Sequence, residues 1–234
     1  IYFDTPQQTV RRHGFSLRVR KRGPHHVQTI KADEADSAGL FAREEWERPV
    51  PGERPVLDGD DQPLTAAIGR SGLSKIAPAF ACDVERASWD VSLEGAQVEA
   101  SIDHGEISAG AIAAKICELE LELKGGSPRA LFDLARRLDG EVPLRLGVRS
   151  KADRGYRLLD ASPPRAAKAE PVPLDPAMSA GEAFRRIAML CVRQYRLNEA
   201  VLLERHDPEC VHQARVALRR LRTAFSLFKP LFAG

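Results

Sequence analysis

The segment Glu118–Lys124 (ELELELK) constrains the fold more than any other part of this sequence. Charged residues and leucines alternate through it with the two-residue period of a β-strand. Leu119, Leu121 and Leu123 should therefore pack into a core, while the carboxylates project together from the opposite face. At an effective dielectric of about 20, each neighbouring carboxylate pair costs on the order of 2–3 kcal/mol unless a cation, a basic side chain or water compensates. The segment is therefore either the wet face of an antiparallel sheet or one wall of a cation site.

Several other segments have the pattern of strands with one charged face. Residues 15–21 place Arg18 and Arg20 on one face and Leu17 and Val19 on the other. In chain order, the other such faces carry Thr29 with Lys31; Arg43 with Glu45 and Glu47; Arg86; Glu99 with Ser101 and Asp103; and, on a predicted last strand over residues 150–156, Lys151 and Arg154. In a single open sheet these faces are solvated, whereas in a closed antiparallel barrel they line an interior.

Turn signals separate these strands, so residues 1–158 have the pattern of an antiparallel meander. The turns are predicted at residues 22–24, 51–52, 93–95 and 103–105. One helix is expected over residues 64–76. Another should begin with Ser127 as its N-cap and Pro128 at its first helical position. Its predicted buried residues are Leu131, Leu134 and Leu138.

Residues 159–180 are rich in Pro and Ala, which predicts an interdomain linker. Beyond this linker the apolar period becomes helical, and Asp207-Pro208-Glu209 predicts the start of a second helix. One predicted apolar stripe is Phe184, Ile187, Ala188, Cys191 and Tyr195, and the other is Val211, Ala214, Leu218, Leu221 and Phe225. Two helices make a poor core alone, so we expect the domain that begins at residue 181 to continue past Gly234.

The composition is that of a globular protein, with 43% hydrophobic and 29% charged residues in 234. The net charge is only +2, but basic residues concentrate at positions 11–22 and 215–222, which suggests anionic partners. The four cysteines form no Cys-x-x-Cys pair, so buried free thiols are expected rather than a zinc knuckle or a disulfide framework. Without a signal peptide or a bilayer-spanning apolar run, the sequence predicts a cytoplasmic protein with no membrane partner.

The charged strand faces combine guanidinium groups with carboxylates. Arginine is suited to bidentate contact with phosphate, and carboxylates are the hard oxygen ligands that Mg²⁺ and Mn²⁺ prefer. Rows of carboxylates would repel nucleic acid, so nucleic acid is not a favoured partner. The combination predicts a site for a metal ion and a phosphate chain.

Six short motifs occur in a distinctive order along the first part of the chain. They are Tyr2–Pro6 (YFDTP), Leu17–Arg20 (LRVR), Thr29–Lys31 (TIK), Arg43–Glu45 (REE), Glu118–Glu122 (ELELE) and Ser150–Tyr156 (SKADRGY). In this order they resemble the motifs of CYTH domains, the triphosphate tunnel metalloenzymes, over residues 1–158. The resemblance implies an α+β fold in which an eight-stranded antiparallel β-barrel with flanking helices binds a linear triphosphate. It also implies that the end phosphate is hydrolysed with the help of Mg²⁺ or Mn²⁺.

The resemblance further implies roles for individual residues. The implied phosphate ligands are Arg18, Arg20, Lys31, Arg86, Lys151 and Arg154. The implied metal ligands are Glu120 and Glu122, with Glu118 and Asp103 as further ligands or as groups behind them. Glu45 would orient a basic partner or a metal-bound water, and Glu45 and Lys151 are the expected catalytic residues.

A second basic segment, residues 212–222 (HQARVALRRLR), lies in the helical part of the chain. Three of its arginines recur at helical spacing on one face, a histidine lies one turn earlier, and a fourth arginine is turned aside. No acidic residue stands four positions from the three in-line arginines and no aromatic residues interleave, so a bound polyanion is favoured over nucleic acid or a merely solvated helix. The segment resembles the first signature helix of CHAD domains, which are polyphosphate-binding helical bundles. The implied polyphosphate ligands are His212, Arg215, Arg219, Arg220 and Arg222.

One expected motif is absent from the sequence. The opening strand of the family carries Glu-x-Glu-x-Lys, and nothing before Tyr2 supplies it, so half of the expected metal site is missing. Because residue 1 is Ile rather than Met, we expect the natural protein to extend upstream and the barrel seen here to show a gap at one edge. The favoured function is hydrolysis of tripolyphosphate or another linear polyphosphate. The alternatives are thiamine triphosphatase or class IV adenylate cyclase in the same fold, and a noncatalytic polyphosphate-binding protein.

Overall fold

The computed structural model describes residues 1–32, 38–40, 43–58, 63–93, 95–161 and 163–232. The chain divides into two compact units. The first contains Ile1–Lys31, Glu45–Arg145 and Lys151–Ala161, and the second contains Ala32–Glu44, Leu146–Ser150 and Ser162–Gly234.

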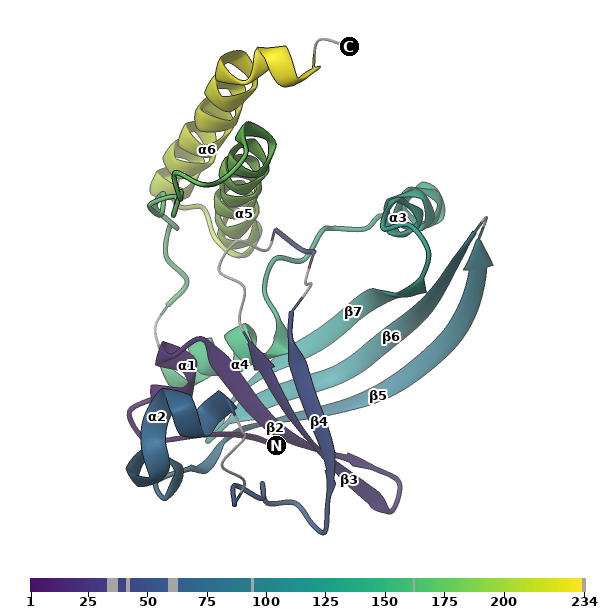
Figure 1. Ribbon diagram of the computed structural model, residues 1–234, viewed down its shortest axis with the longest axis vertical. Helices are drawn as coiled ribbons and strands as arrows, with labels where there is room; N and C mark the ends of the chain where they lie inside the picture. The colour runs from purple at the N-terminus through teal and green to yellow at the C-terminus, as the bar shows by residue number, and fades with distance from the viewer. Residues whose placement is uncertain (33–37, 41–42, 59–62, 94, 162, 233–234) are drawn as a thin grey trace. The chain divides into compact units, whose positions relative to one another are not determined.

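The first unit is built on a seven-stranded sheet with the order β4-β3-β2-β1-β5-β6-β7 (Figure 1). Its strands are β1 (Tyr2–Asp4), β2 (Phe15–Arg22), β3 (His25–Ala32), β4 (Glu45–Val50), β5 (Ala77–Leu93), β6 (Ala96–Ala109) and β7 (Ile112–Gly125). The strands β2 to β4 and β5 to β7 follow one another as two meanders, and β1 pairs antiparallel with both β2 and β5 to join them. The predicted antiparallel fold class with flanking helices is therefore confirmed.

The sheet is open in the described part of the chain. Its edges are β4 and β7, and the long strands β5 to β7 curve along their length (Figure 1). A barrel closes only when its two edge strands pair, so the seven strands do not form the closed eight-stranded barrel that the family resemblance implies.

Four helices flank this sheet: α1 (Thr9–Arg12), α2 (Pro63–Leu73), α3 (Arg129–Glu141) and α4 (Lys151–Leu159). The predicted helix over residues 64–76 is α2, which ends three residues early and is interrupted at Gly69, whose φ is 63°. The helix predicted after Ser127 is α3, but it begins one residue later than predicted, with Pro128 rather than Ser127 as its N-cap. The Ser127 hydroxyl accepts a hydrogen bond from the Arg129 amide at 3.3 Å. Of its three predicted core leucines only Leu134 is buried, and the other two are half-buried.

The prediction of a last strand over residues 150–156 is wrong, because Lys151–Leu159 form the helix α4. Its buried residues are Ala152, Gly155 and Tyr156, which have the i, i+3, i+4 spacing of a helix face. The segment is short, and its basic residues, Lys151 and Arg154, resemble those on the charged faces of the strands. The helical spacing of its small and aromatic residues was the signal that should have decided the prediction.

The turn predicted at residues 103–105 is also wrong, since β6 runs straight through them and the chain turns at Gly110, whose φ is 60°. Gly105 is instead required by a close approach between strands. A Cβ atom on Gly105 would lie 2.1 Å from the carbonyl oxygen of Asp83 on β5. A glycine in a strand can therefore mark a neighbouring backbone rather than a turn.

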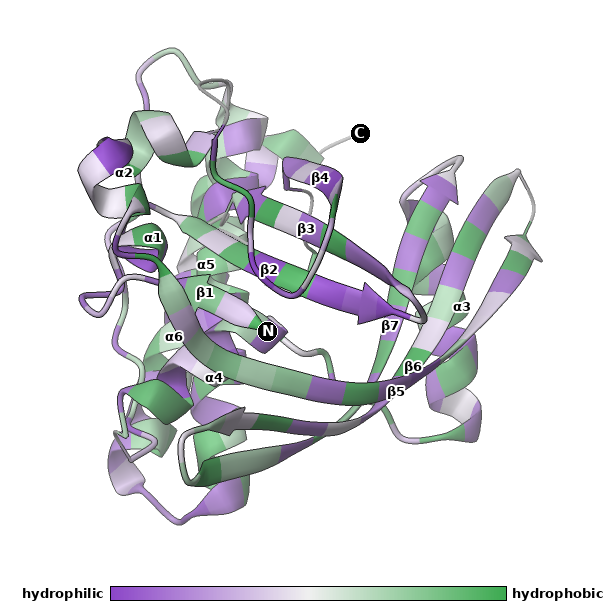
Figure 2. Cartoon of the chain, turned by 90° about the horizontal axis from the view of Figure 1, so that it is seen from below, coloured by the Kyte–Doolittle hydropathy of each residue, from purple (hydrophilic) through white to green (hydrophobic). Residues whose placement is uncertain are grey.

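The alternation in β7 correctly separates two faces, but the leucine face is not the core. Leu119, Leu121 and Leu123 are only half-buried, although α3 contacts β6 and β7. The prediction that these leucines pack into a core is therefore wrong. Figure 2 shows the alternation as purple and green bands along β6 and β7.

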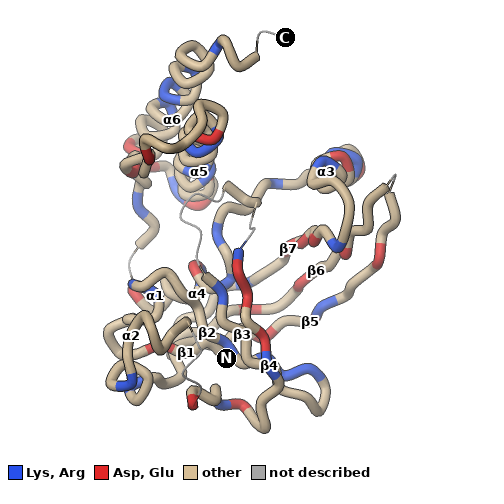
Figure 3. Tube along the Cα trace, in the orientation of Figure 1, with Lys and Arg blue, Asp and Glu red and all other residues tan. Residues whose placement is uncertain are grey.

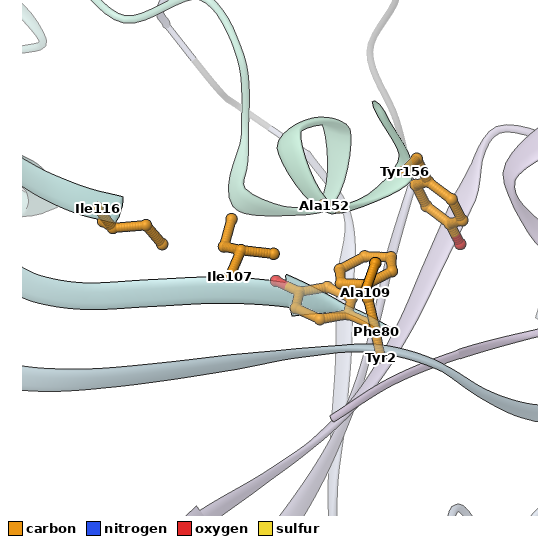
Figure 4. Close-up of a cluster of buried hydrophobic side chains, with 7 residues drawn as sticks. All are labelled: Tyr2, Phe80, Ile107, Ala109, Ile116, Ala152 and Tyr156. Atoms are coloured by element: carbon orange, nitrogen blue, oxygen red, sulfur yellow. The ribbon is translucent and has the colours of Figure 1, made fainter. Parts of the chain in front are cut away.

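Two apolar clusters hold the first unit together. One lies behind β2, where the predicted alternation is confirmed: Leu17 is 0% and Val19 3% exposed on the face opposite Arg18 and Arg20. Its other buried members are Phe3, Val10, Ile30, Val50 and Leu64. The second cluster lies between α4 and the strands β5 to β7 (Figure 4) and contains Tyr2, Phe80, Ile107, Ala109, Ile116, Ala152 and Tyr156.

Asp4 anchors α4 to the start of the sheet. Its buried carboxylate accepts hydrogen bonds from the amides of Val10 and Arg11, at 2.8 and 3.1 Å, and from the Tyr156 hydroxyl at 2.7 Å. The guanidinium of Arg11 stacks over the Tyr156 ring at 4.8 Å. One carboxylate thus satisfies the amides that begin α1 and fixes the middle of α4.

The second unit contains a helical hairpin, α5 (Ala180–Glu204) and α6 (Pro208–Leu227), followed by the short 3-10 helix η1 (Lys229–Phe232). Residues 163–179 before it contain neither helix nor strand. A capping box between Ser179 and Glu182 begins α5, and the Asp207 side chain caps α6 as its sequence predicts. This confirms the predicted hairpin.

The buried face of α6 differs from the predicted stripe. Val211, Leu218 and Phe225 are 47–50% exposed. The buried residues are Cys210, Gln213, Ala214, Ala217 and Ala224, which face α5. The helix presents its small residues to α5, and of the larger apolar side chains Val211 and Leu218 are largely exposed, whereas the half-exposed Phe225 ring packs edge-on against Phe184 of α5 with centroids 5.1 Å apart.

All four cysteines are free, but only Cys191 and Cys210 are buried; Cys82 is half-buried and Cys117 is exposed. Among the described residues, no helix combines the length and the apolar character needed to cross a bilayer.

Candidate functional site

One face of β5 to β7 changes along its length from apolar to charged. Because side chains alternate along a strand, Phe80 and Arg86 share a face of β5, and Ile107 and Asp103 share the same face of β6. The apolar end of this face is covered by α4 (Figure 4), and the acidic residues follow along β6 and β7 (Figure 3). The first residue of α4, Lys151, lies where the apolar part ends and the charged part begins.

Three carboxylates gather at this boundary. Asp103 on β6 pairs with Glu118 on β7 in the strand register, and Glu120 lies one same-face step further along β7. Asp103 is fully buried, while Glu118 and Glu120 are 25% and 46% exposed. One oxygen of each carboxylate lies within 4.8 Å of the others. We call these three residues the acidic cluster.

Lys151 contacts every member of the acidic cluster. Its ammonium lies 2.6 Å from Asp103 Oδ2 and 2.6 Å from Glu120 Oε1, and it also donates to Glu118 Oε1. The Lys151 side chain is only 10% exposed. The cluster is therefore closed on one side by a buried cation.

Two arginines complete the neutralisation of the acidic cluster. Arg86 on β5 makes a bidentate contact with Asp103, with Nε to Oδ1 and Nη2 to Oδ2 both at 2.6 Å, and its Nη2 also donates to Glu120. Arg154 on α4 donates to Glu118 Oε2 at 2.9 Å and to the Lys115 carbonyl at 2.7 Å. Bidentate arginine pairs of this kind are among the strongest charge-assisted hydrogen bonds.

These contacts shift the pKa values of four of the groups, Asp103, Glu120, Lys151 and Arg86. Burial alone would raise the pKa of Asp103 and Glu120, but the hydrogen bonds and charges of Lys151 and Arg86 outweigh it and lower both pKa values. Burial would lower the pKa of Lys151, yet the carboxylates raise it above its ordinary value of 10.5. The hydrogen bond to Asp103 likewise raises the pKa of Arg86. All of these groups are therefore charged at neutral pH.

The shifts predict an acid-sensitive fold in the presence of a chelator. Because the folded-state pKa values of Asp103 and Glu120 are depressed, their stabilisation is complete above their unfolded values of 3.8 and 4.5 and is lost as the pH falls further. We expect the Tm by circular dichroism to be level between about pH 8 and about pH 5.5 and to drop below about pH 4.5. Asp103→Asn should lower the Tm at pH 7 and make the decrease of the Tm at acidic pH smaller than in the wild-type protein. A Tm that rises on acidification would contradict the pairing.

Other basic residues that are expected to bind phosphate lie on β2 and β3. The Nε atoms of Arg18 and Arg20 are buried and have no hydrogen-bond partner within the described part of the chain. The pKa of Arg20 is lowered first by burial and then by the positive charges of Arg18, Arg22 and Arg86. The charge of Glu47 opposes this shift, so Arg20 lies among several guanidinium groups with one carboxylate beside it.

On the neighbouring strands the predicted residues form ordinary pairs. Lys31 on β3 pairs with Glu45 on β4. Glu47 accepts a hydrogen bond from the Thr29 hydroxyl at 2.8 Å, and its carboxylate lies 3.7 Å from the Arg20 guanidinium. The sequence pattern places Glu47 on the same strand face as Glu45 but predicts no role for it. Its position two residues after Glu45 was the available signal.

Glu122 stands apart from the acidic cluster. Its carboxylate lies 2.7 Å from the ammonium of Lys124, which is also 3.5 Å from Glu99, and the Glu122 side chain is 63% exposed. The group of carboxylates that could hold a metal, as found in the described residues, contains Asp103, Glu118 and Glu120 without Glu122. The structure thus brings together three of the four acidic residues predicted as metal ligands.

The donor set of the acidic cluster suits a hard divalent cation. It offers three carboxylates whose oxygens are close enough to converge on one ion, and carboxylate oxygens are preferred by Mg²⁺ and Mn²⁺. The three carboxylates already surround one cation, the Lys151 ammonium. Their arrangement therefore stabilises positive charge.

The basic residues of the second unit are split by the fold. His212, Arg215, Arg219 and Arg222 are exposed on α6. Arg220 instead donates to Gln194 Oε1 on α5 at 3.1 Å, and Gln194 donates to Gln213 Oε1 at 3.1 Å. Arg220 is therefore engaged inside the hairpin, a role that depends on buried polar residues of α5 that the sequence pattern did not single out.

Comparison with known proteins agrees with this architecture. The family model for the CYTH domain matches residues 1–156, and the model for the CHAD domain matches residues 186–234. A protein of Haemophilus influenzae named inorganic triphosphatase is 30% identical in an alignment of 165 residues that covers 67% of this chain and 44% of that protein. This chain therefore spans less than half the length of that relative. Among solved structures, a candidate adenylate cyclase from Bacillus halodurans gives a TM-score of 0.43 at 15% identity and covers 65% of this chain and 78% of its own.

Proposed function

The chain belongs to the CYTH domain family, and on that premise we propose that it hydrolyses the end phosphate of inorganic triphosphate in a metal-dependent reaction. The observation that carries the proposal is the presence, on one sheet, of two arginines whose buried Nε atoms have no hydrogen-bond partner among the described residues and of a cluster of three carboxylates. Buried polar atoms without partners are rare in folded proteins and need an explanation. A linear phosphate chain supplies acceptors to the arginines, and a divalent cation suits the carboxylates.

In this proposal the basic residues bind and orient the phosphate oxygens. Arg18 and Arg20 are the leading contacts because their Nε atoms have no partner among the described residues. The other proposed contacts are Lys31, Arg86, Lys151 and Arg154. Asp103, Glu118 and Glu120 would hold Mg²⁺ or Mn²⁺, which when bound offsets phosphoryl charge and lowers the pKa of water. Glu45 would keep the Lys31 ammonium directed at the substrate through their ion pair.

Inorganic triphosphate is favoured over an organic triphosphate by the second unit. The Haemophilus influenzae relative is named for inorganic triphosphate, and the helical unit that the CHAD domain model matches, which we propose binds polyphosphate, suits the same class of substrate. Thiamine triphosphatase and class IV adenylate cyclase activities are the alternatives within the fold.

The test is phosphate release by the full-length protein from tripolyphosphate, ATP and thiamine triphosphate, with Mg²⁺, with Mn²⁺ and with a chelator. We expect tripolyphosphate to give the highest kcat/KM and the chelator to abolish release. Faster release from thiamine triphosphate or cyclic AMP formation from ATP would reassign the substrate. Absence of metal-dependent phosphate release from all three substrates would contradict the enzymatic function and favour a noncatalytic polyphosphate-binding protein.

We further propose that the exposed arginines of α6 bind polyphosphate. Arg215, Arg219 and Arg222 are exposed, and each is one helical turn from the next, so they offer a row of cations to an extended polyanion. Arg220 is proposed to act only indirectly, because its guanidinium is engaged with Gln194.

This proposal predicts a charge-selective loss of binding. Arg219→Glu combined with Arg222→Glu should weaken binding of long-chain polyphosphate by about 100-fold at low salt, because each reversal replaces attraction with repulsion. Fluorescence anisotropy of labelled polyphosphate would measure it. Arg136→Glu on α3, an exposed arginine of the first unit, is the matched control and should change the affinity little. Equal losses in both variants would contradict the assignment.

A further inference from the structure

The acidic cluster is bound by a cation that belongs to the chain itself. The residues that could hold a metal are Asp103, Glu118 and Glu120, and the Lys151 ammonium contacts a carboxylate oxygen of all three. An ammonium group has three N–H donors, and here three carboxylates surround it. A divalent ion and the Lys151 ammonium therefore compete for the same oxygens.

The charges around the cluster are already balanced without a metal. Three carboxylates face three cations, since Lys151 contacts all of the carboxylates, Arg86 contacts Asp103 and Glu120, and Arg154 contacts Glu118. Addition of a divalent ion to this set would leave an excess of two positive charges in a partly buried site. Such an excess is unfavourable unless a resident cation leaves or an anion enters.

Among the three cations, Lys151 is the one that can leave with least rearrangement. Arg86 is locked by a bidentate contact with the fully buried Asp103. Lysine carries its charge on a flexible four-carbon chain and makes point contacts rather than a planar fork. The ammonium can therefore move by changing side-chain rotamers.

The helix that carries Lys151 need not move for this exchange. Tyr156 holds α4 to Asp4 through its hydroxyl, and the Tyr156 ring packs edge-on against Phe80 with centroids 5.0 Å apart. Lys151 lies at the first position of α4, beyond these anchors. The backbone stays fixed while the end of one side chain moves.

We propose that the Lys151 ammonium is a resident cation that holds the acidic cluster in the metal-free protein and is displaced from it when a divalent metal binds. This inference rests on the proposed function, which supplies the metal. Displacement frees the ammonium for the phosphate chain, so metal binding and substrate binding are coupled through one side chain. Tripolyphosphate should therefore tighten the binding of the metal, and the metal that of tripolyphosphate.

The first test measures Mn²⁺ binding by electron paramagnetic resonance of free Mn²⁺, with Mn²⁺ as the sole ligand added to full-length protein. Lys151→Met removes the competing charge, so we expect its Mn²⁺ affinity to be roughly tenfold or more above wild type. Lys124→Met is the matched control, because Lys124 lies on the same strand as Glu118 and Glu120 but pairs with Glu122 and Glu99 instead; the Mn²⁺ affinity of this variant should stay within about twofold of wild type. Unchanged or weaker binding by Lys151→Met would overturn the inference.

A second test uses the wild-type protein and does not depend on the folding of a variant. Reductive dimethylation followed by peptide mass spectrometry reports how accessible each lysine amine is. We expect slow labelling of Lys151 in chelator and faster labelling in Mg²⁺, with the exposed Lys21 and Lys75 unchanged. Labelling of Lys151 that is unchanged or slower in Mg²⁺ would refute the displacement.

The two proposals can fail separately. Metal-dependent release of phosphate from tripolyphosphate, together with equal Mn²⁺ affinity in wild type and Lys151→Met, would overturn the exchange alone. Tighter Mn²⁺ binding by Lys151→Met, together with no metal-dependent phosphate release by the wild-type protein, would support the exchange and overturn the proposed hydrolysis.

Discussion

Glu120→Gln should lower kcat for tripolyphosphate by about 100-fold or more, because it removes a negative charge from the centre of the acidic cluster. The Glu120 carboxylate contacts Lys151 and Arg86 and is one of the three that could converge on a metal. Glutamine keeps the shape of the side chain but is a weaker ligand for a hard cation. The measurement is steady-state phosphate release with saturating Mn²⁺, with the Tm recorded to exclude unfolding.

Glu122→Gln is the matched control for this prediction. Glu122 lies two residues away on the same face of β7, but its carboxylate pairs with Lys124 and stands outside the acidic cluster. We expect its kcat to stay within about threefold of wild type, as for a solvent-screened surface pair. A loss for Glu122→Gln as large as that for Glu120→Gln would return Glu122 to the metal ligands implied by the family resemblance.

The contrast between these two glutamates marks what the sequence could predict about the site. The two-residue period assigned Glu118, Glu120 and Glu122 to one face, and the strand register bears this out. The period cannot say which carboxylates along a strand will meet a cation. That choice depends on where α4 places Lys151. The contacts of Lys151 with Glu120 and Glu118 are tertiary, because these residues are separated from it by 31 and 33 positions in the chain.

The same limit explains the errors in the fold. Residues 150–156 carry basic side chains like those of the charged strands, but Ala152, Gly155 and Tyr156 also have the i, i+3, i+4 spacing of the helix that forms. Alternation and helical spacing overlap in so short a segment. In the second unit, the exposure of Leu218 and the engagement of Arg220 both follow from how α6 meets α5, which the pattern of one helix does not contain.

Gly155→Ala should destabilise the first unit by about 1–3 kcal/mol and also damage its proposed activity, because the site of substitution supports the helix that carries Lys151. A Cβ atom on Gly155 would lie 2.1 Å from Cε2 and 2.2 Å from Cδ2 of the Phe80 ring. That ring cannot easily retreat, since it is 4% exposed and stacks on Tyr2 with centroids 4.5 Å apart. The helix α4 must therefore move away from the sheet.

Displacement of α4 would carry Lys151 and Arg154 away from Asp103, Glu118 and Glu120. Misplacement of catalytic groups by about 1 Å can cost on the order of 100-fold in rate, and we expect a loss of kcat of that order in Gly155→Ala. The Tm from circular dichroism and phosphate release below the Tm together separate the loss of folded protein from the loss of geometry in the protein that remains folded.

Gly140→Ala provides the matched control for this substitution. Gly140 is also a helical glycine, in α3, but it is exposed, and a Cβ atom there would meet nothing within 4 Å. Replacement of a glycine by alanine in an exposed helix favours the folded state by up to about 1 kcal/mol, so the Tm should stay level or rise and kcat should not change. An unchanged Tm and kcat in Gly155→Ala would contradict the prediction. It would mean that α4 can move away from Phe80 without loss of activity, and that Lys151 reaches the acidic cluster without the anchoring that the packing of Gly155 and Tyr156 supplies.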